Sequence, residues 1–307
     1  MRYPVKALLA FFFICIAWGT TYLAIKIGVA AWPAFLYAGI RQVTSGIIIM
    51  SIAFAVHKKA DFSWANLRHQ LLIGFLMITM GNGLVTWAEK YIPSSIAALI
   101  CAMMPVCAVI INLAINKQER MNMLITIGMM LGFCGVALNF RDSFTALSNS
   151  KYVIGIIATF IATSSWALGS IFNKKKKAVI NPVFNSGLQL GFGGLFLLMG
   201  SPLVDDYSKA DFYNQDALWA LAYLIVVGSV LAYTAYMYAL KALPVGLVMV
   251  YAYINPLVAV FLGFLLLHEP LNLFTALSFA SILAGVFLVN KGYKQQASAA
   301  AIVPLED

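Results

Sequence analysis

The chain consists of long stretches without a charged side chain, separated by short polar segments. A helix that crosses the hydrocarbon core of a bilayer needs about 20 predominantly apolar residues. Residues 33–56 are interrupted by Arg41 alone and form one predicted span. Nine further runs without Asp, Glu, Lys or Arg are long enough to span, and they occupy 7–25, 70–88, 91–116, 121–140, 152–173, 178–204, 217–240, 242–267 and 270–290.

These runs predict helices rather than strands. The strands of a membrane barrel have about 9–11 residues of alternating polarity, whereas these runs are longer and apolar without alternation. The connecting segments are too short to hold a domain, the longest being 57–70 and 205–216. The pattern therefore predicts an all-α integral membrane protein with ten transmembrane helices.

The composition supports this class. Of 307 residues, 62% are hydrophobic and 10% are charged, against about 25% charged in a soluble domain. This argues against a water-soluble enzyme and against a nucleic-acid partner, despite the net charge of +9. The four cysteines, Cys15, Cys101, Cys107 and Cys134, lie inside spans without a C-x-x-C pair, so we expect neither a disulfide nor a metal site.

The positive charges are distributed unequally between the two sides of the membrane. With ten spans, fourteen of the 20 Lys and Arg residues lie on one side, including Lys174 to Lys177, and five lie on the other. Cytoplasmic loops carry an excess of Lys and Arg. Both termini are therefore expected in the cytoplasm, with 291–307 as a short cytoplasmic tail.

The chain contains an internal repeat. The segment 18–26 reads W-G-T-T-Y-L-A-I-K, and 166–174 reads W-A-L-G-S-I-F-N-K, at an offset of 148 residues. Further pairs matched at offsets of 149 to 151 are Pro33 and Pro182, Lys90 and Lys241, Pro105 and Pro256, and Gly135 and Gly285. We interpret the chain as a duplication with a first repeat at 8–140 and a second repeat at 152–290.

Each repeat holds five predicted spans, so the second enters the membrane from the side opposite to the first. Two inverted five-helix repeats are typical of secondary transporters, which bind substrate near the midplane and alternate between two openings. The glycine pairs Gly128 and Gly132, and Gly187 and Gly191, permit close helix packing.

Matched positions in inverted repeats are expected to face one another across a central site. This selects Trp18 with Trp166 and Asn82 with Tyr233, while Pro105 and Pro256 are predicted helix kinks that free the carbonyls of Cys101 and Ala252. The candidate substrate-binding residues are Trp18, Thr21, Arg41, Asn82, Trp166, Ser170, Tyr233, Tyr251 and Asn255.

Ionisable side chains at membrane depth are candidates for function. Arg41 lies deep in its span, and its counterpart in the second repeat is Leu190. It suits a substrate carboxylate or phosphate, or a structural role with helix-end carbonyls or near Gln42. Glu89 is a candidate for proton coupling, with solvation at the rim of the third span as the alternative.

The motifs quoted above, together with G-N-G-L-V-T-W-A-E-K at 81–90 and Y-A-Y-I-N-P-L-V-A-V-F-L-G at 251–263, resemble an EamA-type permease of the drug/metabolite transporter superfamily. The resemblance covers about residues 8–290. It implies ten helices in two EamA repeats, the bacterial cytoplasmic (inner) membrane, and export of small metabolites such as amino acids, or of toxic compounds. The small multidrug exporters of this superfamily use a glutamate in the first span, which this chain lacks.

We therefore predict a secondary transporter, not an enzyme, that exports amino-acid-like or amphipathic metabolites by alternating access. One alternative is a proton-coupled multidrug antiporter in which Glu89 carries the proton. Another is an intramembrane enzyme, against which stand three histidines at predicted loop positions (His57, His69 and His268), no H-E-x-x-H motif and no deep carboxylate pair. The expected partners are a small-molecule substrate and the lipid bilayer, with no cofactor, and a monomer suffices.

Overall fold

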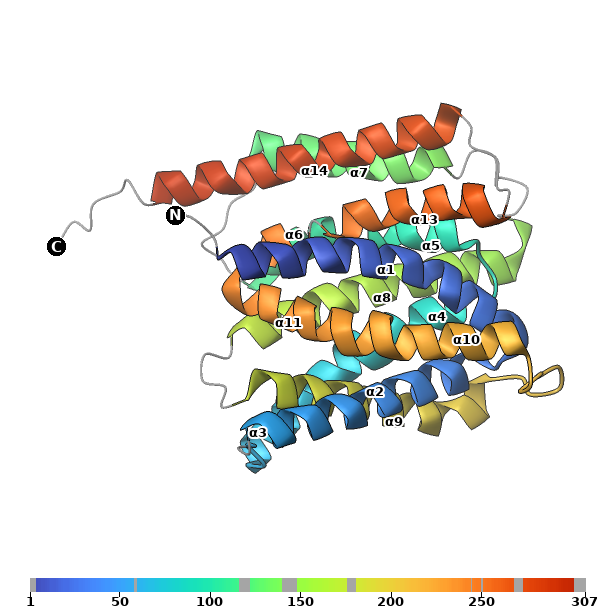
Figure 1. The fold of residues 1–307 in the computed structure, drawn as a ribbon. Helices are drawn as coiled ribbons and strands as arrows, with labels where there is room; N and C mark the ends of the chain where they lie inside the picture. Colours follow the sequence, from blue (N-terminus) through green and yellow to red (C-terminus); the bar gives the residue numbers. More distant parts are fainter. Residues whose placement is uncertain are drawn as a thin grey trace.

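The computed structural model describes residues 4–57, 60–115, 122–139, 148–175, 181–243, 245–249, 251–267 and 273–300. The described residues are helical almost throughout and include no strand. The helices lie side by side with their axes roughly aligned (Figure 1). The all-α prediction is confirmed.

The first half of the chain begins with two long helices and continues with helices that change geometry or break midway. Its elements are α1 (Val5–Ala31), α2 (Ala34–His57), α3 (Trp64–Ile73), the π-helix η1 (Gly74–Gly83), α4 (Leu84–Ala88), α5 (Ser94–Cys101), α6 (Met104–Ile115) and α7 (Met123–Asn139). The segments α3, η1 and α4 form one uninterrupted helix.

The second half follows the same order. Its elements are α8 (Ser150–Lys175), α9 (Pro182–Val204), α10 (Gln215–Tyr223), the π-helix η4 (Leu224–Leu231), α11 (Ala232–Ala242), α12 (Val245–Val248), α13 (Tyr251–Leu267) and α14 (Leu273–Ala300). The segments α10, η4 and α11 again form one continuous helix.

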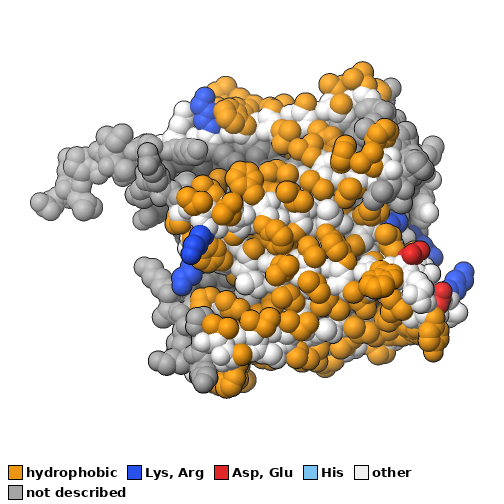
Figure 2. Space-filling model, in the orientation of Figure 1, with side chains coloured by type: hydrophobic (Ala, Val, Ile, Leu, Met, Phe, Trp, Pro, Cys, Tyr) orange, Lys and Arg blue, Asp and Glu red, His pale blue; other side chains and the backbone are white. Residues whose placement is uncertain are grey.

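Seven helices of the described part are long and apolar enough to cross a membrane. They are Val5–Ala31, Ala34–Val56, Trp64–Ala88, Ser94–Ile111, Ser150–Lys174, Pro182–Val204 and Gln215–Ala242. Shorter apolar helices lie at Met123–Gly135 and Ala276–Val289. Hydrophobic side chains cover much of the face seen in Figure 2, and the charged side chains visible there gather toward its two ends. This distribution is that of a membrane protein.

The prediction of a polar connecting segment over 57–70 is wrong in its C-terminal bound, because α3 already begins at Trp64. Ser63 caps this helix by accepting a hydrogen bond from the Asn66 backbone N–H at 3.3 Å, and a capped helix extends beyond its apolar run. His69 therefore lies in a helix and not in a loop. The side chain of His57 and all of His268 fall outside the described residues.

Helices from the two halves pack closely in pairs through glycine. A Cβ added at Gly46 of α2 would lie 2.8 Å from the Gly187 carbonyl oxygen of α9, and one added at Gly128 of α7 would lie 2.4 Å from that of Gly285 in α14. Figure 1 shows α2 beside α9 and α7 beside α14. The predicted packing role is confirmed for Gly128 and Gly187, since only a residue without a side chain permits these approaches.

The two π-helices occupy matched places in the sequence, η1 beginning at Gly74 and η4 at Leu224. A π-helix has wider turns than an α-helix and is frequent at functional sites. Asn82 lies in η1, and Ser229 lies in η4. The fold thus places a local change of helix geometry on both sides of the bundle centre.

Candidate functional site

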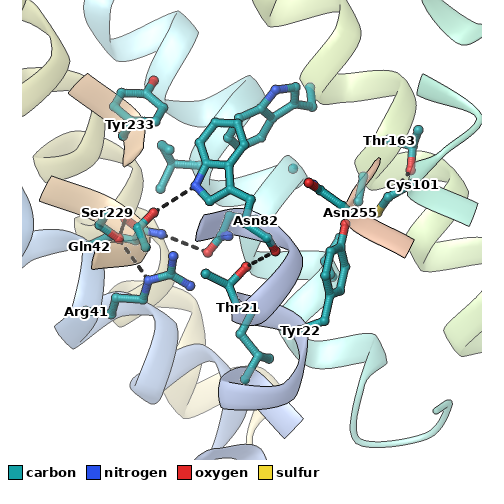
Figure 3. A pocket seen from close by; sticks show the side chains of 18 of the residues that line it. Thr21, Tyr22, Arg41, Gln42, Asn82, Cys101, Thr163, Ser229, Tyr233 and Asn255 are labelled. Atoms are coloured by element: carbon teal, nitrogen blue, oxygen red, sulfur yellow. Dashed lines mark hydrogen bonds between the residues drawn. The ribbon is translucent and has the colours of Figure 1, made fainter. Parts of the chain in front are cut away.

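A cavity of about 70 Å³ lies at the centre of the bundle, between α1, α2, η1, α8, η4 and α13. It brings together eight of the nine residues proposed from the sequence: Trp18, Thr21, Arg41, Asn82, Trp166, Tyr233, Tyr251 and Asn255. Figure 3 labels Thr21, Arg41, Asn82, Tyr233 and Asn255 among them. A water molecule takes about 30 Å³ in the liquid, so this volume holds only a few waters. A metabolite requires the cavity to widen.

One wall of this central cavity is aromatic. The rings of Trp18 and Trp166 lie perpendicular to each other with their centroids 5.5 Å apart. Trp18 also contacts Tyr251 at 4.8 Å and Tyr236 at 5.0 Å, and Trp166 lies 6.3 Å from Tyr233. The Trp18–Tyr236 pair is tilted and the other three are edge-to-face, all at separations typical of favourable aromatic pairs. The two tryptophans that the repeat relates therefore contact each other directly.

Another part of the lining is polar and centres on Arg41, which is 3% exposed. Its Nε donates to Ser229 Oγ at 2.9 Å, and Ser229 Oγ donates to Gln42 Oε1 at 3.3 Å. Gln42 Nε2 donates in turn to Asn82 Oδ1 at 2.8 Å (Figure 3). This chain joins α2, η1 and η4. The Nη1 of Arg41 has no hydrogen-bond partner among the described residues.

The candidates on α1 and α13 have most of their polar atoms engaged. Thr21 Oγ1 donates to the Trp18 carbonyl at 2.7 Å, and the Tyr251 hydroxyl donates to Met104 Sδ at 3.4 Å. With its amide oriented to satisfy both ends, Asn255 Nδ2 donates to the carbonyls of Cys15 and Tyr251, each at 3.0 Å. Among the candidates, Arg41 Nη1 and Trp166 Nε1 are therefore the buried donors without a hydrogen-bond partner in the described part of the chain, and Arg41 is the charged one.

Ser170 is not among the residues that line the central cavity. Its hydroxyl donates to the Trp166 carbonyl and bonds the Tyr236 hydroxyl, both at 2.7 Å. Among the lining residues that were not predicted from the sequence are Gln42 and Ser229, which extend the hydrogen-bond network of Arg41. Both are polar residues inside apolar runs, a pattern that does not show which neighbours they face.

The predicted kinks differ between the halves. In the first, α5 ends at Cys101 and α6 begins at Met104, directly before Pro105, so the helix breaks where that proline removes a donor. Pro256 lies inside α13, which continues past it.

Glu89 does not lie at a solvated rim, and that interpretation is wrong. Its side chain is fully buried, and neither carboxylate oxygen has a hydrogen-bond partner among the described residues. Glu89 directly follows α4, at the end of the charge-free run 70–88. Because α4 packs against α8 and α1, these neighbouring helices cover that end. Lys26 and Arg41 are the cations that attract this carboxylate electrostatically. Glu89 does not line the central cavity.

Comparison with known proteins gives the same fold and a family. The EamA-like transporter family matches residues 5–141 and again 153–291. The chain is 31% identical over 285 residues to the uncharacterized inner membrane transporter YedA of Escherichia coli (strain K12), covering 92% of this chain and 90% of that protein. It is 27% identical over 290 residues to the uncharacterized transporter YvbV of Bacillus subtilis (strain 168), covering 94% and 92%. A solved crystal structure shares the fold with a TM-score of 0.71 at 19% identity, over 94% of this chain and 98% of the other.

Proposed function

The chain belongs to the EamA-like transporter family and is a membrane transporter. On this premise we propose that it exports small metabolites across the bacterial cytoplasmic membrane by alternating access. The proposed substrates are amino-acid-like or amphipathic molecules that carry an anionic group. The observation that carries this proposal is Arg41, a buried guanidinium with an unused donor in the lining of a cavity that also holds an aromatic cluster.

We propose ten membrane crossings arranged as two inverted five-helix repeats, 8–140 and 152–290. Besides the seven long helices, the remaining crossings are α7, α13 and α14. The matched π-helices and the packing of α2 on α9 and of α7 on α14 support this arrangement. Two antiparallel copies provide two conformations of similar energy, each open to one side.

The proposed topology places both termini, and the segment 291–307, in the cytoplasm. Its support is the excess of Lys and Arg on one side. Reporters fused after Lys177 and after Asp211 test it, because the two positions are expected on opposite sides of the membrane. Labelling of both from the same side would contradict the inverted arrangement.

The chemistry of the two walls indicates the substrate class. A guanidinium pairs with a carboxylate or phosphate through two parallel N–H groups. The rings of Trp18, Trp166 and Tyr251 offer an apolar surface, and their electron-rich faces also attract a cationic group. A small molecule with a carboxylate at one end and an apolar or ammonium-bearing portion at the other satisfies both walls.

The experiment is a thermal-stability screen of the purified protein against amino acids, organic acids and cationic dyes. A ligand that binds only the folded state stabilises it by about 2.7 kcal/mol at 100 times its dissociation constant. We expect a carboxylate-bearing compound to raise the unfolding temperature of the parent protein and to lose this effect in Trp18→Ala and Asn255→Ala.

The matched control for Trp18→Ala is Trp64→Ala, since Trp64 is 75% exposed at the start of α3. This variant is expected to keep the full ligand shift. Stabilisation by cationic dyes alone, with no response to any carboxylate, would contradict the proposed substrate class.

A proton-coupled multidrug antiporter remains a second candidate, and the burial of Glu89 favours it. The equivalent position in the second repeat holds Leu240, which is also buried. The repeat fold therefore does not require a carboxylate at this place. A buried carboxylate without hydrogen-bond partners is well suited to bind and release a proton.

A further inference from the structure

A second cavity, of about 220 Å³, lies at the end of the bundle where α8 and α11 end. We call it the outer chamber because it lies toward an end of the bundle, in contrast to the central cavity. It is lined by side chains of α3, α8, α9 and α11, among them Gln70, Asn185, Gln189 and Lys241. Three of its four amide residues, Gln70, Asn185 and Gln189, are at most 5% exposed, so polar groups face an interior space at the edge of a membrane protein.

The amide groups at the outer chamber form a continuous hydrogen-bond network. Asn66 Nδ2 donates to Asn185 Oδ1 at 3.0 Å, and Gln70 Nε2 donates to Asn66 Oδ1 at 2.9 Å. Gln189 Nε2 donates to Gln70 Oε1 at 2.6 Å and to Asn173 Oδ1 at 3.2 Å. These neutral groups exchange readily with water or with the polar groups of a solute.

Only a thin layer separates the outer chamber from the central cavity. The Tyr233 hydroxyl donates to Gln189 Oε1 at 2.6 Å. Tyr233 lines the central cavity, whereas Gln189 lines the outer chamber. Beside them, the Ser170 and Tyr236 hydroxyls bond at 2.7 Å. We call these four residues the septum, and each is at most 2% exposed. In Figure 3 the Tyr233 hydroxyl points away from Arg41.

We propose that the outer chamber is a second site on the path of the transported molecule and that the septum is the closed gate between this site and the central cavity. The proposal rests on the proposed function and adds where a small polar or anionic solute lies before or after it occupies the central cavity. No acidic residue is among the described residues that line the outer chamber, and Lys241 lies in its wall.

The contacts at the septum suit a gate. Each of its two hydrogen bonds joins neutral side chains from different helices, α9 with α11 and α8 with α11. A displacement of α11 therefore breaks both together. The freed groups of Tyr233 and Gln189 face the two cavities, where water or a solute replaces the lost partner. Lys174, by contrast, is held by the carbonyls of Leu240, Lys241 and Leu243, which ties the end of α8 to α11 beyond the gate.

The test uses a native cysteine and needs no substrate. Cys101 lines the central cavity, so a protein in which Cys15, Cys107 and Cys134 are replaced by alanine reports on access to that cavity. A membrane-impermeant anionic methanethiosulfonate reagent is applied, in sealed vesicles, from the side that bears Lys241. We expect Tyr233→Phe and Gln189→Ala each to raise the labelling rate of Cys101 several-fold.

Two controls separate opening of the gate from general loosening. Tyr37→Phe removes the hydroxyl of another fully buried tyrosine, which donates to the Ala217 carbonyl at the other end of the bundle, and it is expected to leave the Cys101 rate unchanged. Asn173→Cys, in a background without Cys101, places a thiol at a half-buried position in the wall of the outer chamber and is expected to label rapidly with an intact septum.

An unchanged Cys101 rate in both septum variants, with Asn173→Cys labelling as expected, would overturn the proposal. Slow labelling of Asn173→Cys would also overturn it, because the outer chamber would then be closed to solutes. Neither result bears on ligand binding in the stability screen, so the proposed function stands or fails separately.

Discussion

Lys26 and Lys174 hold equivalent places at the two ends of the bundle. Lys26 Nζ donates to the backbone carbonyls of Glu89 and Ile92, and Lys174 Nζ donates to those of Leu240 and Leu243. The offset is 148 for the lysines and 151 for both pairs of carbonyls. Each lysine thus donates to backbone carbonyls that have no intrahelical hydrogen-bond partner at a helix C-terminus. Because α1 and α8 end at opposite ends of the bundle (Figure 1), this relationship supports inverted repeats.

Replacing either lysine by methionine is expected to destabilise the protein. A buried carbonyl left without a donor costs about 1–3 kcal/mol. Lys26 is half-buried and Lys174 is exposed, so the loss is expected to be larger for Lys26→Met than for Lys174→Met. Thermal unfolding in one detergent measures both. Lys209→Met, in an exposed loop, is the control, and an equal loss there would contradict this role.

Arg41→Leu is expected to fold and to lose ligand binding. Leu190 occupies the equivalent place in the second repeat and is buried, so the repeat fold accepts leucine there. Removing one member of a buried charge pair destabilises by about 3–5 kcal/mol, and Arg41 is one of the two cations that attract Glu89. The unfolding temperature without ligand is therefore expected to fall, and the shift caused by a carboxylate-bearing ligand is expected to disappear. Retention of that shift would remove Arg41 from the site.

Glu89→Gln tests proton coupling. Glutamine keeps the shape of the side chain but neither binds nor releases a proton near neutral pH. If Glu89 carries the proton, a pH gradient drives transport in proteoliposomes of the parent protein but not in those of the variant, which still equilibrates the compound. Asp216→Asn, at the exposed start of α10, is expected to behave like the parent. An equal response of parent and Glu89→Gln would exclude this role.

Two glycines of α7 provide a matched pair for the packing of α7 against α14. A Cβ at Gly128 would lie 2.4 Å from the Gly285 carbonyl oxygen and 2.8 Å from the Val289 backbone nitrogen, whereas a Cβ at Gly132 meets nothing closer than 3.7 Å. Alanine is favoured over glycine inside a helix by about 1 kcal/mol. Gly132→Ala is therefore expected to be neutral or stabilising.

Gly128→Ala is expected to lower the unfolding temperature, because backbone atoms of α14 cannot move aside independently and the helices must separate. Unfolding temperatures in one detergent compare the two variants. Equal values would show that α14 adjusts to the added methyl group without cost.

Several features of the site were predictable because they follow from order along the chain. The offset of 148 residues relates Trp18 to Trp166 before any coordinates are known, and their rings contact each other. Arg41 stands out as the one cation inside a predicted span, and it lies in the wall of the central cavity. Ser229 was not found, because a serine in an apolar run gives no sign of which neighbour it faces.

The sequence by itself determined that the chain is a helical membrane protein with a duplicated pattern, because the length of charge-free runs, the placement of lysines and a constant offset are all properties of a linear string. Only the tertiary structure decided that Glu89 is buried and that Ser170 bonds the Tyr236 hydroxyl instead of lining the central cavity. It also decided that the Tyr233 hydroxyl donates to Gln189 between the two cavities. Each of these depends on which helix covers which face of its neighbour. A sequence that is apolar on every side of its helices does not specify that choice.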